Sequence, residues 1–540
     1  MPLIKIDLPQ RLVLPGAIFF LIALLTILEV PMLSFSNGLV IYPQDDGYIR
    51  MAIARNLANS GVWGLSPHEF SNASSSILYP ILLAGAFKIF GVQPVIPLLV
   101  NLLAAVGVII TLQRWLKQQG IIPFYQLLIL MAIIYLTPLH IMVMDGMEHT
   151  LQIWLSLFFL LAFFEWKSQE KNAAGKYPAV PWRLCLYGAL MTSIRYEGLF
   201  LVGVACVFLL LRRKWMAAAL LLIIALVPVA LFGMYSMAHN GYFVPNSMLV
   251  KAIPLPLNAD TIGTFFKESI VNKLLYPYPT KGNVAANRLL ILIPLVYGHY
   301  FPSLKTNRLY RHIIYFSLSI TFLHLIFASA IQFYRYEAYL VACSLVIPAV
   351  LLAKEGIPLF YIKSNSARCI VAWAMIFLLY PFFSRSWAAY EEAGDGLLHE
   401  YQYSYQAANF LHRYYNDATV VMDEVGMASF LSTGRKLDLL TGIAYTETTR
   451  ARVEGTIPVG YLNYLLKKEK VVIAFIAENN YHPMLRQGWT KVAAWYTDVK
   501  LPSGGEVDIF AVEPAAVSSL RANLKAFQAT MPVGVRVNYF

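Results

Sequence analysis

The sequence has few charged residues: they make up 13% of its 540 residues, against roughly 25% in a typical soluble domain. Hydrophobic residues make up 58%, so we expect most of the chain to lie in lipid. Acidic residues are fewer than basic ones, and the formal net charge is +12. Lys and Arg gather in the cytoplasmic loops of membrane proteins, so this excess follows from topology and does not indicate a nucleic-acid partner.

Cysteine is also scarce. The four cysteines lie in apolar runs, and none lies in the polar C-terminal region; they are Cys185, Cys206, Cys343 and Cys369. This placement argues against a disulfide framework and against a cysteine metal site. The first apolar run, at about 12–33, is longer than the core of a signal peptide and lacks a small-x-small cleavage site, so we interpret it as a retained span.

Nine apolar runs are long enough to cross about 30 Å of hydrocarbon. They lie near 12–33, 92–113, 121–139, 149–165, 215–236, 286–303, 312–330, 337–353 and 369–385. Two shorter runs, 183–193 and 198–211, are predicted to form a hairpin, which brings the expected total to about eleven membrane helices. Lys and Arg alternate between the loops in a way that predicts a cytoplasmic N-terminus and an outward hairpin tip.

The outer loop after the first span contains two expected helices, at 47–60 and 77–90, and the first has the pattern of a helix lying in the membrane interface. The hydropathy changes after about residue 386. There, β-like runs alternate with helical segments; they lie at 418–422, 471–476, 492–496 and 507–512. We therefore predict a polytopic α-helical transmembrane domain, 1–385, and an extracytoplasmic α/β domain, 386–540.

The first outer loop begins with Gln44-Asp45-Asp46-Gly47-Tyr48-Ile49. Two adjacent carboxylates at a membrane surface are costly to hold together, because each raises the pKa of the other and both need hydrogen-bond partners. Our hypothesis is that Asp45 or Asp46 is the general base of a membrane-embedded sugar transferase. The alternative is a solvated acidic pair that caps the helix beginning near Gly47.

Other unusual charges of the membrane region fall on the same predicted side; they are Asp145, Glu148, Arg195, Glu197, Lys251, Arg335 and Glu337. A charge at mid-membrane costs about 2.5–3.5 kcal/mol on insertion scales, so charges at the outer ends of several spans predict a water-filled cavity opening outward. The alternative is that Arg195 with Glu197, or Arg335 with Glu337, forms an ordinary ion pair at a loop tip.

Carboxylates near separate cations suit a hydroxyl that attacks a sugar carried on a lipid phosphate. One aspartate would take the hydroxyl proton, an effect worth roughly 10²–10⁴-fold. Arg and Lys would hold the phosphate and stabilise the charge that builds on it as it leaves. A phosphate leaving group needs no general acid, and direct attack inverts the anomeric centre.

The motifs Asp45-Asp46-x-Tyr48-Ile49, Ala54-x-Asn56-Leu57-Ala58 and Leu78-Tyr79-Pro80-x-Leu82-Leu83-Ala84 resemble the first outer loop of the GT-C superfamily. Its members are polytopic glycosyltransferases that use polyprenyl-phosphate sugars, among them protein O-mannosyltransferases and the aminoarabinose transferases of lipid A. Further signatures resemble the branch of terminal arabinofuranosyltransferases of actinobacterial cell walls: Gly146-Met147-Glu148, Arg195-x-Glu197-Gly198, Pro245-Asn246-Ser247 with Lys251, and Asp423-Glu424-Val425-Gly426.

The resemblance implies an inverting transfer, of a sugar such as arabinofuranose, with a first-loop aspartate as base; we favour Asp45 over Asp46. It also implies donor-phosphate ligands, namely Lys251, Arg195 and Arg335. Weaker candidates for substrate binding are Glu197, Asn246, Glu148, Asp145, Tyr48, His68 and Glu69. Tyr196 stands where that branch commonly has Pro, which leaves the geometry around Arg195 open.

The expected partners are a polyprenyl-phosphate sugar donor, a glycan, lipid or protein acceptor, and the lipid bilayer. No cofactor is required; the acidic pair has room for a divalent cation, but no His, Asp or Glu spacing demands one. We expect a bacterial inner-membrane protein whose C-terminal domain is periplasmic. One alternative is a transporter or flippase for a lipid-linked saccharide, although the sequence lacks the repeat symmetry this predicts. A second is a silent scaffold whose soluble domain binds a partner.

Overall fold

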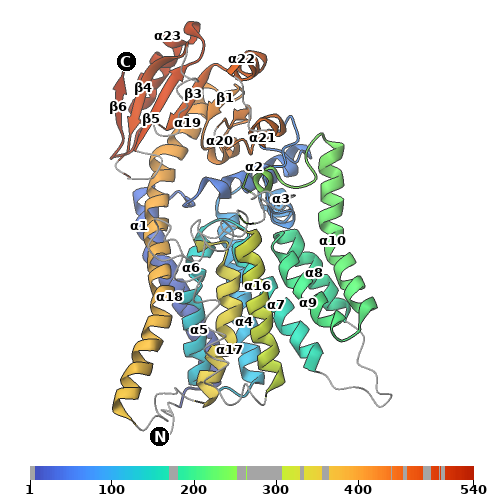
Figure 1. The fold of residues 1–540 in the computed structure, drawn as a ribbon. Helices are drawn as coiled ribbons and strands as arrows, with labels where there is room; N and C mark the ends of the chain where they lie inside the picture. The colour runs from blue at the N-terminus through green and yellow to red at the C-terminus, as the bar shows by residue number, and fades with distance from the viewer. Residues whose placement is uncertain are drawn as a thin grey trace.

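The computed structural model describes residues 7–168, 181–251, 263, 307–328, 334–355, 364–439, 441–453, 459–477, 488–497, 499 and 505–540. Long helices run side by side, and a small sheet domain covers one end of them (Figure 1). The predicted span at 286–303 lies outside the described residues.

Six of the described helices are long and apolar enough to cross a membrane. They are α1 (Gln10–Phe35), α4 (Val95–Gln118), α7 (His149–Ser168), α10 (Trp215–Ala238), α16 (Arg308–Phe327) and α17 (Ala338–Glu355). Each coincides with a predicted span, and the chain is a membrane protein. The predicted total of eleven helices is not confirmed.

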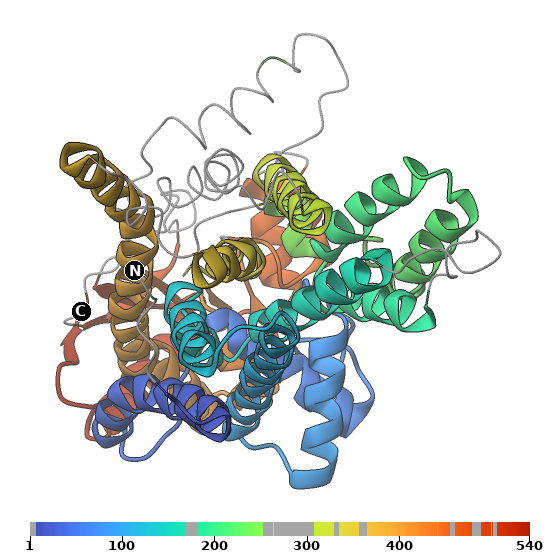
Figure 2. The ribbon, with the colours of Figure 1, turned by 90° about the horizontal axis from the view of Figure 1, so that it is seen from below.

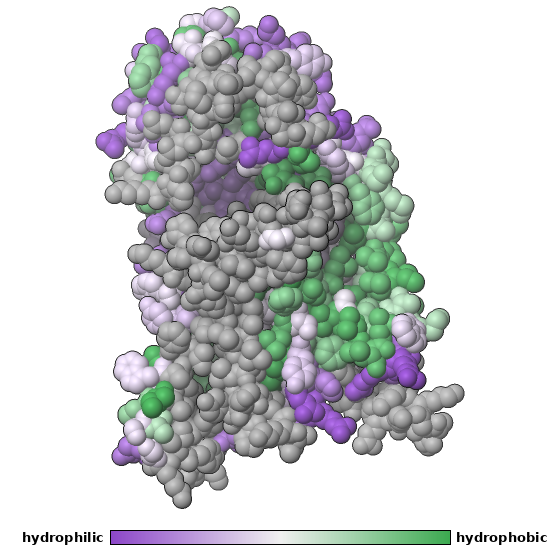
Figure 3. Space-filling view, in the orientation of Figure 1, coloured by the Kyte–Doolittle hydropathy of each residue, from purple (hydrophilic) through white to green (hydrophobic). Residues whose placement is uncertain are grey.

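Shorter helices complete the bundle. They are α5 (Pro123–Leu136), α6 (Leu139–Met144), α8 (Trp182–Ile194) and α9 (Gly198–Leu210). The last two form the predicted hairpin, and they pack with α10 as a wing on the opposite side of the bundle from α1 (Figure 2). Hydrophobic residues cover the wing, whereas hydrophilic residues gather over the sheet domain (Figure 3).

One helix joins the bundle to the sheet domain. This helix, α18 (Asn365–His399), has 35 residues and continues through a π-helical turn (Glu400–Ser404) into α19 (Tyr405–Tyr414). The predicted domain boundary at 386 therefore falls inside a continuous helix. Near its upper end, a Cβ at Gly396 would lie 2.4 Å from the carbonyl oxygen of Pro43, so the close approach of α18 to the first outer loop requires glycine there.

The domain contains one six-stranded sheet with the order β2-β1-β3-β5-β4-β6. The strands are β1 (Val420–Met422), β2 (Lys436–Leu437), β3 (Ile473–Ala477), β4 (Thr490–Tyr496), β5 (Glu506–Ala511) and β6 (Arg536–Tyr539). The pairs β1–β2 and β1–β3 are parallel and the other pairs are antiparallel. The four predicted β-like runs are confirmed, and β2 and β6 were not predicted.

The two faces of the sheet follow the alternation of side chains along a strand. Phe475 of β3 packs with Phe410 and Trp495 on the face covered by α19. Its neighbours Ala474 and Ile476 belong to a second apolar cluster on the other face. The remaining helices of the domain are α20 (Gly426–Leu431), α21 (Thr446–Val453), α22 (Val459–Lys468) and α23 (Val517–Gln528).

A layer of short helices lies between the bundle and the sheet. It contains the two helices predicted in the first outer loop, α2 (Asp45–Ser60) and α3 (Leu78–Phe90), together with α11 (Asn246–Lys251) and α20. Both predicted helices are confirmed. However, α2 packs between α3 and α20, and nine of its residues are buried, so its apolar stripe contacts protein rather than being free to lie on lipid.

Candidate active site

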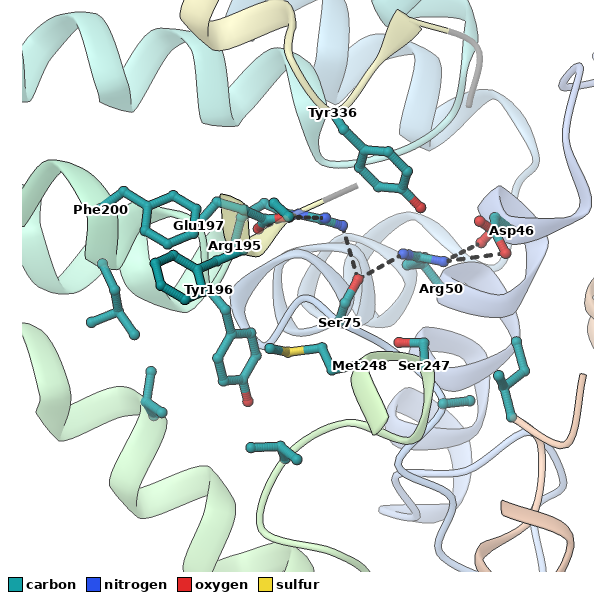
Figure 4. A pocket seen from close by; sticks show the side chains of 17 residues that line it. Asp46, Arg50, Ser75, Arg195, Tyr196, Glu197, Phe200, Ser247, Met248 and Tyr336 are labelled. Carbon is teal, nitrogen blue, oxygen red and sulfur yellow. Dashed lines mark hydrogen bonds and ion pairs between the residues drawn. The ribbon is translucent and has the colours of Figure 1, made fainter. Parts of the chain in front are cut away.

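A cavity of about 400 Å³ lies in this layer, where α2 meets the outer ends of several bundle helices. One end is polar, with side chains of Asp46, Arg50, Ser75, Arg195, Glu197, Ser247 and Tyr336. Apolar side chains complete the lining, and Phe200 lies at the end away from Asp46 (Figure 4); they are Leu199, Phe200, Val229, Val244, Met248 and Phe327. The polar side chains point toward one another across the same space (Figure 4). The cavity therefore presents a charged end together with an apolar lining.

Asp46 is the carboxylate of the acidic pair that lines this cavity. It lies in the first turn of α2, and its side chain is 24% exposed. Arg335 donates from Nη2 to its Oδ2 at 2.5 Å, and Arg50 lies 4.0 Å from Oδ1. The spacing of four residues places Arg50 on the same face of α2, where it also donates to the backbone carbonyl of Asp46 at 2.9 Å.

Arg335 lies behind Asp46 and does not line the cavity, since only 1% of its side chain is exposed. Its guanidinium also donates to Gln44 and to Met147, and it lies 5.0 Å from the ring centre of Tyr336. The sequence left open an ion pair between Arg335 and Glu337. In the structure Glu337 instead pairs with Arg385 of α18 at 3.2 Å.

Two arginines converge on the buried carboxylate of Glu148. Arg50 donates to it from Nε at 3.2 Å, and Arg195 donates from Nη1 at 2.9 Å. Burial by itself would raise the pKa of Glu148, but the two guanidinium groups hold that pKa well below its ordinary value. Both arginines also donate to the hydroxyl oxygen of Ser75, at 3.2 and 2.9 Å. The polar end thus has two fixed cations around one neutral oxygen.

Arg195 lies at the tip of the α8–α9 hairpin. It forms the local ion pair with Glu197 that the sequence left open, at 2.6 Å, and it lies 5.2 Å from the ring centre of Tyr336. The turn is tight, because a Cβ at Gly198 would lie 2.8 Å from the carbonyl oxygen of Met191. The glycine of the Arg-x-Glu-Gly signature therefore brings the hairpin tip into contact with the cavity.

The loop before Glu148 has a similar requirement. Gly146 has φ +67°, and a Cβ there would lie 2.6 Å from the ring of Tyr42. Its carbonyl oxygen accepts from the Tyr79 hydroxyl at 3.1 Å. These contacts set the position of Glu148 beside the two arginines that line the cavity, and they explain the glycine in Gly146-Met147-Glu148.

Asp45 faces away from the cavity and toward the sheet domain. Its two carboxylate oxygens accept from the backbone N–H groups of Gly426, at 2.7 Å, and Met427, at 2.8 Å. Burial, together with the nearby charge of Glu424, raises the pKa of Asp45 to about 7 against the opposing effect of these bonds. The acidic pair is therefore divided: Asp46 faces the cavity and Asp45 binds α20.

Several titratable side chains lie near Asp45 on the side of the sheet domain. Glu424 accepts from His399 at 3.0 Å and from Ser404 at 2.5 Å. Burial would raise the pKa of Glu424, yet His399 lowers it, whereas burial and the charges of Glu424 and Asp45 raise the pKa of Glu400 well above its ordinary value. No group of three or more His, Cys, Asp or Glu residues suited to a metal ion occurs in the described ranges.

The other predicted site residues are buried or bound elsewhere. Tyr48 accepts from the backbone N–H of Tyr42 at 3.0 Å, and Asn246 donates to the carbonyl oxygen of Ile443 at 3.0 Å. Asp145 accepts from Gln44 at 2.7 Å, and burial raises its pKa to about 7. All three side chains connect helices and loops of the layer.

Two further predicted residues, Glu69 and His68, lie in the first outer loop and are not part of the cavity lining. Glu69 is ion-paired with Arg435 of the sheet domain, and its neighbour His68 is exposed. Lys251 ends α11, and its side chain lies outside the described residues. Sequence reasoning missed Arg50, Ser75 and Tyr336. Only the first carried a signal, which is its spacing of four residues from Asp46.

The C-terminal region matches a family described as a domain of unknown function (DUF8728), over residues 394–511. The sequence matches none of the curated proteins with which it was compared. The apo form of the oligosaccharyltransferase of Archaeoglobus fulgidus is similar in structure, with a TM-score of 0.50 and 12% identity over 94% of this chain and 74% of that one. The chain shares the fold of that oligosaccharyltransferase.

Two further solved structures are similar at lower scores. ArnT from Cupriavidus metallidurans bound to undecaprenyl phosphate has a TM-score of 0.49 and 13% identity, over 93% of this chain and 98% of that one. AglB from Archaeoglobus fulgidus in complex with an inhibitory peptide and a dolichol-phosphate has a TM-score of 0.44 and 12% identity, over 92% and 74%.

Proposed function

We propose that this chain is an inverting glycosyltransferase that moves a sugar from a polyprenyl-phosphate donor to a hydroxyl of an acceptor outside the membrane, with Asp46 as the general base. The observation that carries the proposal is the cavity: a carboxylate and two arginines occupy one end, and apolar side chains complete the lining. The GT-C fold, shared with an oligosaccharyltransferase, supports the same reaction class.

The polar end and the apolar lining of the cavity fit the two parts of a lipid-linked sugar. Leu199, Phe200 and Phe327 lie on α9 and α16, which are apolar helices of the bundle, so a prenyl chain would leave the cavity along them. Arg50 and Arg195 converge on Ser75, where phosphate oxygens would replace or join its hydroxyl as acceptors. Guanidinium groups bind phosphate with charge-assisted hydrogen bonds.

Asp46 suits the base better than Asp45 because of where each carboxylate lies. Asp46 is partly exposed to the cavity, whereas both oxygens of Asp45 already accept backbone N–H bonds. Arg335, the residue implied as a phosphate ligand, is placed to favour the ionised form of Asp46 from behind.

In the proposed reaction, the acceptor hydroxyl oxygen attacks the anomeric carbon and its proton passes to Asp46. The bond between that carbon and the phosphate oxygen breaks, and the electron pair leaves with the phosphate. Arg50 and Arg195 stabilise the charge that develops on the leaving oxygen, which is the role that fixed donors play in such transition states. Attack from the face opposite the phosphate inverts the anomeric centre.

The sugar class in this proposal is a pentofuranose such as arabinofuranose, and it rests on the four short signatures that resemble the arabinofuranosyltransferase branch. The acceptor is a glycan, lipid or protein that reaches the cavity beneath the sheet domain. We further propose that Lys251 is a donor-phosphate ligand, that the N-terminus is cytoplasmic, and that residues 386–540 face the periplasm of a bacterial inner membrane.

The test uses purified protein in lipid, a polyprenyl-phosphate arabinofuranose labelled in the sugar, and an acceptor glycan. We expect Asp46→Asn to lower kcat by roughly 10²–10⁴-fold, the usual contribution of a general base. Arg50→Lys keeps the positive charge but loses the planar set of guanidinium N–H groups. This variant should mainly raise the KM for the polyprenyl-phosphate sugar. Full activity in Asp46→Asn would refute the base assignment. Movement of labelled donor across liposomes without transfer would instead favour a flippase.

A further inference from the structure

The side chain of Asp45 and that of Arg55 hold the two ends of α20. Asp45 binds the N–H groups of Gly426 and Met427, which begin this helix, and Arg55 donates to the carbonyl oxygens of Phe430 at 2.7 Å and Ser432 at 3.4 Å, which end and follow it. These end groups lack partners inside a helix. The carboxylate and the guanidinium of α2 therefore satisfy the ends of a helix that lies more than 370 residues away in sequence.

The two backbones also touch at the first residue of α20. A Cβ at Gly426 would lie 2.1 Å from the carbonyl oxygen of Asp45 and 2.9 Å from the backbone nitrogen of Ile49. Only glycine fits such an approach, so the contact fixes the distance between α2 and α20 at the first turn of both helices.

A neighbouring face of α2 carries the cavity residues. Residues 45 and 49 meet α20, whereas Asp46 and Arg50 line the cavity, which is the pattern expected for two neighbouring faces of one helix with 3.6 residues per turn. Rotation of α2 about its axis would move both sets together. The contact with α20 therefore sets the direction in which Asp46 points.

We infer that Asp45 is a positioning residue: it docks the C-terminal domain on α2 and thereby orients the general base Asp46. The second part of this inference, the orientation of the base, rests on the proposed function. The first part, the docking of the domain on α2 (the docking half), rests on the described contacts alone. The inference gives the domain matched by the family of unknown function a task in the reaction, because Gly426 and Met427 lie within residues 394–511. The domain contributes Ile443 to the cavity lining, and through α20 it sets the direction of α2.

The first experiment measures hydrogen exchange in the full-length protein. Asp45→Ala should raise the exchange rates of the Gly426 and Met427 amides at least tenfold, and it should also raise exchange in the first turn of α2. Asp395→Ala, which removes an exposed carboxylate of α18, is the matched control and should leave both regions unchanged. Unchanged exchange at both amides in Asp45→Ala would overturn the docking half, whether or not the protein proves to be a transferase.

The second experiment measures transfer kinetics. Asp45→Ala and Arg55→Ala should each lower kcat about 10- to 100-fold with a donor KM within threefold of wild type, and the double variant should be no slower than the slower single variant, because both act through α20. Asp45→Asn keeps one acceptor oxygen and should recover part of kcat. If Asp45→Asn is as inactive as Asp46→Asn while its amides exchange normally, Asp45 is the base and the inference is wrong.

A wild-type protein that transfers no sugar would refute the proposed function by itself. The exchange in the first turn of α2 would then decide the inference: an increase in Asp45→Ala shows that this residue orients the helix carrying Asp46, and no increase overturns it.

Discussion

Replacing Glu148 by Gln should separate the stability of the cavity from its affinity for an anion. Glu148 is fully buried, and it accepts hydrogen bonds from both Arg50 and Arg195. The amide that replaces it can accept one of these bonds but carries no charge. Two guanidinium groups would then remain buried beside each other without their shared counter-ion.

The expected loss of stability is large, because removing one partner of a buried ion pair costs about 3–5 kcal/mol. A phosphate bound between the two arginines would replace the missing charge. The polyprenyl-phosphate donor should therefore bind Glu148→Gln more tightly than it binds the wild type, although the ligand-free variant is less stable. A ligand present at 100 times its Kd stabilises a protein by about 2.7 kcal/mol, so a tenfold gain in affinity adds about 1.4 kcal/mol to the rescue.

Thermal unfolding in detergent, with and without polyprenyl phosphate, measures both effects. We expect a lower Tm for ligand-free Glu148→Gln and a larger rise in Tm on addition of the lipid. Glu197→Gln is the matched control: its carboxylate pairs with Arg195, and its side chain is 15% exposed where that of Glu148 is 0% exposed. An equal rise in Tm for wild type and Glu148→Gln would refute the idea that a phosphate takes the place of this carboxylate.

Three further predictions concern the residues and helices that position the cavity side chains. Gly146→Ala should lower the free energy of unfolding by roughly 1–3 kcal/mol, since it combines a left-handed φ with a steric clash, whereas the control Gly85→Ala has nothing within 4 Å and should not. Burial raises the pKa of Asp45 from 3.8 to about 7, so the folded state binds this proton more tightly than the unfolded state. The free energy of unfolding should therefore fall as the pH rises from about 4 to 7. Thermal unfolding of Asp45→Asn over the same pH range should show a smaller fall. Insertion of four alanines after Tyr390 should preserve the bundle but separate α2 from α20, with loss of transfer and of amide protection at Gly426.

The architecture could be predicted to a large extent because its signals are local. Apolar length identified the six described spans, and alternation identified β1, β3, β4 and β5. The strands β2 and β6 have two and four residues, and so short a segment carries little pattern. The predicted end of the membrane domain falls within α18, because composition changes along this helix while its backbone continues unbroken.

The candidate site was predicted only in part, because its geometry depends on contacts between distant segments. The acidic pair was found, and the family resemblance favoured Asp45 as base, whereas Asp46 is the member of the pair that lines the cavity. Asp45 and Asp46 face different ways because Asp45 binds α20. The sequence near residue 45 gives no sign of a contact with a helix that begins at Gly426. Ser75 carried no signal for a similar reason, since a serine in a small-residue loop becomes notable only when two arginines converge on it.

The continuous helix α18 has a consequence for which acceptors the protein can use. At 1.5 Å per residue its 35 residues extend about 52 Å, roughly 20 Å more than the hydrocarbon core of a bilayer. The helix thus holds the sheet domain at a fixed height above the hydrocarbon core. If the chain is the proposed transferase, we expect it to prefer acceptors whose hydroxyl groups project to about that height above the headgroups. We therefore expect the preferred acceptor to change with the thickness of the bilayer.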